Sequence, residues 1–199
     1  MNYMESLGNV TLAALFEAAA SSNPTPGGGC VSAVGGYFGV SLLLKAIRVS
    51  ARKRPDPVFT KIDEQLIELA SRLLQCAQED SDAFGQYIRA LQLPKASDSE
   101  KATRNQALRD ATVAATDVAL RILNLGNQVL HCAEQVQGKT LPTISADVRA
   151  CVELVSSMNI VARENAQANL SGLTDAEVLR DQLQTQLARH DALRLACTR

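Results

Sequence analysis

The segment from Pro24 to Cys30 constrains this chain more than any other. It reads Pro-Thr-Pro-Gly-Gly-Gly-Cys and is followed by an almost uncharged run to Leu44. Two prolines cannot lie inside a continuing helix, because proline fixes φ and lacks the N–H donor. The three glycines then let another group approach the backbone with no side chain in the way. The segment therefore predicts a loop that ends where a new helix starts.

Small residues follow at helical spacing in that new helix, with large apolar residues around them. The small set is Ser32, Gly35, Gly36 and Gly39. A helix that is apolar nearly all round is typical of the middle of a bundle. Its free N-terminal N–H groups favour an anion or a polar ligand edge. A connector that leads into a core helix, with glycines for close packing only, explains the same residues.

Composition favours an all-α fold, organised as one domain over residues 1–199. Aromatic residues make up only 4% of the chain and Trp is absent, whereas strands prefer aromatic and β-branched residues. Apolar periodicity divides the chain into about six helices around a buried central helix of residues 30–51. The first helix is expected over residues 5–20, with these side chains inward: Leu7, Leu12, Leu15 and Phe16. His190, on the last helix, is expected in solvent.

Charge and cysteine content exclude several classes of function. The 20 basic and 21 acidic residues give a net charge of −1, so nucleic acid is not an expected partner. Five scattered cysteines and two histidines form no zinc-binding pattern, so we expect no metal. Buried thiols in a reducing, cytoplasmic compartment explain them. We find no signal peptide, and the uncharged run is shorter than a membrane span, so no membrane partner is expected.

Asp80 is the first candidate for a functional acid. It falls in the middle of an apolar stripe in the third predicted helix, whereas Glu79 and Asp82 point away from that stripe. A carboxylate on a core-facing stripe needs a partner or keeps its proton, because burial of a bare charge is costly. The sequence leaves open a catalytic group, an internal ion pair or a helix cap. Arg104, in the fourth predicted helix, either meets such an acid or stays in solvent.

A second acid lies in the fifth predicted helix. Asp147 and Asn165 are eighteen residues apart on one apolar face, about 27 Å by helical rise. Polar pairing between helices explains Asn165 more simply than contact with a ligand. The helix dipole equally explains Asp147, which lies near the helix start.

In order along nearly the whole chain, these features resemble the cyclodeaminase/cyclohydrolase family of folate enzymes. Its members include the cyclodeaminase part of formiminotransferase-cyclodeaminase and the methenyltetrahydrofolate cyclohydrolases. The matching blocks are Pro24 to Gly29 with the small-residue helix, Asp80 with Ala83-Phe84, Glu100 to Arg104, Ile144 to Asp147, and Asn165 with Asn169-Leu170. The glycine block is the most specific of them.

The resemblance implies an all-helical homodimer with a folate substrate in a cleft between helices and no further cofactor. It implies hydrolysis of the methenyl bridge between N5 and N10 of tetrahydrofolate, or closure of a formimino group onto N10 with loss of ammonia. Either reaction needs a group that moves protons and an anion beside the cationic amidine. The implied site residues are Asp80 and Asp147 as catalytic acids, and Pro26, Gly27, Gly28, Gly29, Lys53, Arg54, Arg104 and Asn165 in substrate binding.

Three departures from the family pattern fall in regions expected to face the folate. Residues 50–56 keep two basic residues of the family's Thr-x-Gly-Lys-Lys-Lys-Tyr but not its glycine, third lysine or tyrosine. Ala146 replaces the serine before Asp147, and Tyr37 with Phe38 replaces small residues. These changes motivate an alternative, a silent or repurposed member that still binds folate or a similar heterocycle. A helical assembly module without a ligand is the other alternative.

Overall fold

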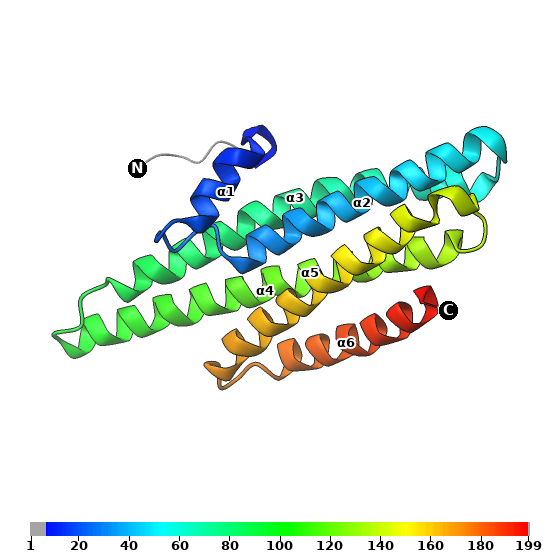
Figure 1. Cartoon of the computed structure of the whole chain (residues 1–199). Coiled ribbons are helices and arrows are strands. Elements are labelled where there is room, and N and C mark those ends of the chain that lie inside the picture. The colour runs from blue at the N-terminus through cyan, green and yellow to red at the C-terminus, as the bar shows by residue number, and fades with distance from the viewer. Residues whose placement is uncertain (1–6, 199) are drawn as a thin grey trace.

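The computed structural model describes residues 7–198 and confirms the predicted all-α bundle. Within that range the chain forms six α-helices, two 3₁₀-helices and no strand. The α-helices are α1 (Leu12–Ala20), α2 (Gly28–Lys53), α3 (Pro57–Leu91), α4 (Asp98–Val136), α5 (Ser145–Ser171) and α6 (Glu177–Cys197). The 3₁₀-helices are η1 (Leu7–Asn9) and η2 (Pro142–Ile144). Figure 1 shows α2 to α5 as a long bundle with α6 along one side.

α2 is the central helix that the glycine segment predicts. It packs against both α3 and α5, and side chains such as Leu43 are fully buried. Its glycines allow the close approach of α5: a Cβ at Gly36 would overlap Met158, and one at Gly39 would lie 3.2 Å from Val155. By length and composition alone, α2 is also the one described helix that could cross a membrane, a test that core helices pass as well.

Capping side chains fix the starts of α3 and α4. Asp56 accepts a hydrogen bond from the backbone N–H of Val58, with Pro57 in the first turn. Ser97 and Glu100 form a capping box at the start of α4. The two helices pair as an antiparallel hairpin, whose tip extends beyond the start of α2 and the end of α5 (Figure 1).

The prediction for the first helix is largely wrong. Residues 5 and 6 lie outside the described range, and the helix itself begins only at Leu12, where Thr11 caps it. Leu7 is buried in η1 and Leu15 is partly buried, but Leu12 and Phe16 are exposed. Nine residues make too short a helix to cover the bundle, so α1 buries few side chains and lies at an angle to the long helices (Figure 1).

His190 is buried, which contradicts the expectation that it lies in solvent. It faces inward from α6, a helix that packs against α4 and α5 and contributes only Leu183 and His190 to the buried residues. Its Nδ1 lies 3.0 Å from Nδ2 of Asn159 on α5. The surrounding side chains strip water from the imidazole and lower its pKa below 6.5.

Candidate functional site

The start of α2 combines a bare backbone with free N–H groups. Pro26 is buried and follows a cis peptide bond from Thr25, and Gly27 is the N-cap residue without a side chain to bond the helix. The first N–H groups of a helix have no partner within it. Because Gly28 and Gly29 form the first turn and carry no side chains, a neighbouring side chain or ligand can approach the free backbone N–H groups of α2 closely.

Asp80 of α3 lies against this start. A Cβ at Gly29 would overlap the Asp80 carboxylate, so only glycine permits the observed approach. Burial raises the pKa of the Asp80 carboxyl above 3.8, while the backbone N–H of Cys30 acts in the opposite direction. No Lys or Arg within residues 7–198 offsets this loss of water around the carboxyl. The arrangement suits a group that takes up and releases a proton.

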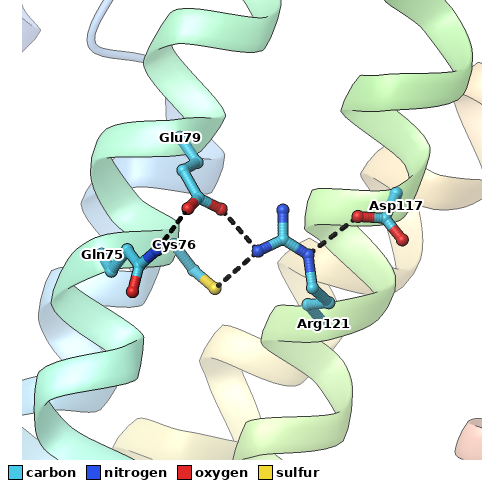
Figure 2. A network of polar contacts seen from close by, with 5 residues as sticks. All are labelled: Gln75, Cys76, Glu79, Asp117 and Arg121. Atoms are coloured by element: carbon cyan, nitrogen blue, oxygen red, sulfur yellow. Dashed lines mark hydrogen bonds and ion pairs between the residues drawn. The ribbon is translucent and has the colours of Figure 1, made fainter.

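Glu79, the neighbouring acid of α3, pairs with a side chain of α4 instead (Figure 2). Glu79 forms an ion pair with Arg121 of α4, whose guanidinium also bonds Asp117 and lies 3.8 Å from the Cys76 sulfur. Gln75 donates a further hydrogen bond to Glu79 at 2.7 Å. This network joins α3 to α4, whereas Asp80, about 100° further round the helix, faces α2. The predicted separation of Asp80 from Glu79 is therefore confirmed.

Asn165 lies near the same end of the bundle. It follows Val161 by one helical turn, and the Val161 side chain lies 3.9 Å from the position of a Cβ at Gly28. Asn165 is half-buried. α2, α3 and α5 thus bring the glycine segment, Asp80 and Asn165 to one region.

Asp147 and the basic candidates lie elsewhere in the chain. Asp147 pairs with Lys45 at 2.9 Å, and Lys45 follows Gly29 by sixteen residues of α2, about 24 Å of helical rise. Lys53 and Arg54 lie further on, at the end of α2, where Arg54 bonds the carbonyl of Thr140. The prediction that both acids serve one site is therefore not met within a single chain, because Asp80 and Asp147 contact α2 at points about 24 Å apart. Periodicity indicated that both acids face inward but not that they lie at different levels of the bundle.

Arg104 does not orient Asp80. Its Nε lies 3.4 Å from the carbonyl of Leu91, eleven residues beyond Asp80 on α3. It lies where α3 ends and α4 begins, at the tip of the hairpin. Arg104 therefore lies beyond Asp80 along α3, at the level of Leu91.

Sequence reasoning missed a polar cluster among α4, α5 and α6. Asn127 donates to the carbonyl and the side-chain oxygen of Gln186, both at 2.9 Å, and Asn159 donates to the side-chain oxygen of Asn127 at 3.1 Å and faces His190. The asparagines that pair between helices are thus Asn127 and Asn159. Gly126 is the signal that was available, because a Cβ there would overlap Asn159.

The fold and this arrangement define a class of all-α protein in which a partly buried acid lies against the bare start of the central helix. Residues 11–188 match the sequence profile of the family described as formiminotransferase-cyclodeaminase, and the chain belongs to that family.

Named relatives agree with this assignment. Methenyltetrahydrofolate cyclohydrolase of Methylorubrum extorquens is 31% identical over 193 residues, which cover 94% of this chain and 93% of that protein. Formimidoyltransferase-cyclodeaminase of Gallus gallus is 24% identical over 168 residues; these cover 82% of this chain but only 31% of the chicken protein. The crystal structure of formiminotetrahydrofolate cyclodeaminase from Thermotoga maritima superposes with a TM-score of 0.85 and 21% identity, covering 96% and 94% of the two chains. That similarity concerns the fold.

Proposed function

We propose that this chain is a folate one-carbon enzyme that acts on the bridge between N5 and N10 of tetrahydrofolate. The observation that carries the proposal is the partly buried Asp80 carboxyl, which lies against the backbone of Gly29 at the start of α2. The family and the names of its relatives supply the substrate class. Among the reactions of that class we favour hydrolysis of the methenyl bridge, because the cyclohydrolase relative matches over nearly the full length of both chains.

Asp80 has the two properties that this hydrolysis requires. Water adds to the methenyl carbon and loses a proton, and the bond from that carbon to N5 then breaks as N5 gains a proton. A carboxyl with a raised pKa can accept the first proton and return it to N5, while its charged form stabilises the cationic amidine. The free N–H groups at the start of α2 can bind a polar edge of the substrate.

Turnover tests this proposal directly. The methenyl absorbance is followed with the unchanged protein and with Asp80→Asn. Hydrolysis above the uncatalysed rate that disappears in the variant supports the proposal. Binding of tetrahydrofolate, seen as a raised melting temperature, without turnover would instead support the silent family member that Ala146 and residues 50–56 suggest.

We also propose that the enzyme works as a homodimer. Positions 28, 31, 35, 38, 42 and 45 form one line along α2 at helical spacing. Along this line Val31 and Phe38 are exposed, and nothing lies within 4 Å of a Cβ at Gly35. An uncovered apolar line on the central helix fits an isologous contact with a second α2.

A dimer of this kind accounts for the distance between the two acids. If two α2 helices pack antiparallel about the middle of the line, Gly28 of one subunit lies opposite Lys45 of the partner subunit. Asp147, which pairs with Lys45 in its own chain, would then approach Asp80 of the other chain. Each active site would take one acid from each subunit.

Mixing two inactive variants tests the shared site. Asp80→Asn and Asp147→Asn are unfolded together and refolded as mixed dimers. A site built from two chains recovers part of the activity, because a mixed dimer keeps one complete site. No recovery, with mixed dimers shown by sedimentation, would contradict the shared site and leave the role of Asp80 to its own assay.

A further inference from the structure

Phe84 and Tyr87 form a stacked pair outside the core of the bundle. Their ring centroids lie 6.1 Å apart with 18° between the planes. Phe84 exposes 42% of its surface and Tyr87 is half-buried. In a chain with four Phe, three Tyr and no Trp, a stacked aromatic pair at the surface is not explained by the packing of the core.

The pair shares a helical face with Asp80. Phe84 and Tyr87 follow Asp80 by four and seven residues, so they lie about 6 and 10 Å further along the same side of α3. Leu91, also exposed, continues this face by one more turn. Because Asp80 meets the first turn of α2, everything beyond it on α3 lies past the start of that helix, as the projecting hairpin in Figure 1 shows.

We propose that Phe84 and Tyr87 form the surface on which the aminobenzoyl ring of the folate substrate stacks, an inference that rests on the proposed function. In bridged tetrahydrofolate the one-carbon unit is bonded to N10, and N10 is bonded directly to the aminobenzoyl ring. A bridge held at Asp80 therefore places that ring about one helical turn away, which is the spacing between Asp80 and Phe84. Aromatic rings pair at centroid distances of about 4.5–7 Å.

The same direction leads to a cation. The glutamate carboxylates of a folate extend from the aminobenzoyl ring on the side away from N10. On α3 that direction passes Tyr87 and reaches Leu91, whose carbonyl lies 3.4 Å from Nε of Arg104. A guanidinium suits a carboxylate, so Arg104 would bind the tail. Lys53 and Arg54 of the same chain lie at the far end of α2 and cannot serve the same molecule.

A comparison of two ligands isolates the contribution of the aminobenzoyl ring to binding. 5-Formyltetrahydrofolate carries the aminobenzoylglutamate, and 6-methyltetrahydropterin lacks it. We expect Phe84→Leu to weaken binding of the first about 10-fold and to leave the Kd of the second unchanged, since one stacked pair accounts for about that factor. Phe16→Leu, an exposed phenylalanine on α1, is the matched control and should change neither Kd. In the unchanged protein the aminobenzoyl protons of the bound folate should shift upfield, and in Phe84→Leu that shift should be lost.

The outcomes distinguish this inference from the proposed function. Suppose that the unchanged protein turns over methenyltetrahydrofolate and that Phe84→Leu binds both ligands with the same Kd values as the unchanged protein. The stacking surface is then wrong, and the enzyme assignment stands. If Phe84→Leu loses both ligands equally or changes the sedimentation of the protein while its helical signal is kept, the aromatic face covers a second chain instead, which also overturns the inference. If the unchanged protein neither binds nor converts a folate, both fall together.

Discussion

Two shielded titratable groups in this molecule, one partly buried and one buried, have much in common at first sight. Asp80 lies at the start of α2, and His190 lies where α4, α5 and α6 meet. Burial shifts the pKa of each group in the direction that favours its neutral form, which is upward for the carboxyl and downward for the imidazole. By burial and pKa alone, either one would qualify as a functional group.

Their neighbours separate them. The backbone carbonyl of Gln186 can only accept, so it orients the Asn127 amide, which in turn fixes Asn159 as the donor to His190. His190 is thereby held neutral in a chain of bonds that ties three helices together. Asp80 faces the glycine backbone of α2 and shares a helical face with the exposed aromatic ring of Phe84. The two groups therefore differ in their surroundings rather than in their pKa shifts: His190 lies in a polar cluster between helices, and Asp80 lies beside an exposed aromatic surface.

Asp80→Asn should have the largest effect. Loss of proton transfer should reduce the rate of methenyl hydrolysis by roughly 10²–10⁴-fold. Asparagine is as good an N-cap as aspartate, so a residue that only caps α2 would keep full activity in this variant. Asp82→Asn, an exposed acid two residues away, is the control and should match the unchanged protein.

Gly29→Ala should follow. Its Cβ would overlap the Asp80 carboxylate, so the acid must move. We expect a loss of activity on the order of 10²-fold and a fall in the free energy of unfolding of about 1–3 kcal/mol, measured in urea. Gly172→Ala, where the nearest atom lies 3.6 Å from the new Cβ, should affect neither quantity much. Full activity in Gly29→Ala would show that the close approach is unnecessary.

His190→Ala should behave in the opposite way. It leaves a buried donor of Asn159 without its acceptor, so the free energy of unfolding should fall by about 1–3 kcal/mol. The turnover of the folded protein should be unchanged. A loss of kcat without a loss of stability would reverse the roles that we assign to the two regions.

The pH dependence of stability should differ in sign between the two regions. The folded state lowers the pKa of His190, so the unfolded chain binds more protons below pH 6.5 and stability falls there as pH falls. Asp191 opposes this shift, and Arg194 and Arg163 add to it. The folded state raises the pKa of Asp80, so stability falls as pH rises from 3.8 through the folded pKa. His190→Gln should remove the first slope only, and Asp80→Asn the second only, in unfolding curves taken from pH 3 to 8.

Lys45→Met should have the smallest effect on folding. The Lys45–Asp147 pair lies on the surface, with the Lys45 side chain 58% exposed, and such pairs contribute about 0–1 kcal/mol. A clear loss of turnover in a variant whose free energy of unfolding is unchanged within about 1 kcal/mol would support the shared dimeric site. Unchanged activity would show that the Lys45–Asp147 pair is not needed for turnover.

Local signals predicted the fold well because they act within a few residues. Asp56 before Pro57, and Ser97 with Glu100, fixed two helix starts. Relations between helices were harder to predict: periodicity says that Asp80 faces inward but not which part of α2 it meets. The same limit hid the burial of His190, since its partner Asn159 comes from another helix.

NMR of carboxyl-labelled protein, in which the Asp80 carboxyl and the His190 imidazole are followed together, distinguishes the two regions in one titration. Addition of 5-formyltetrahydrofolate should move the Asp80 carboxyl resonance and its titration while the imidazole resonances of His190 stay in place. Saturated binding that leaves Asp80 unchanged, or that moves His190 instead, would contradict the account.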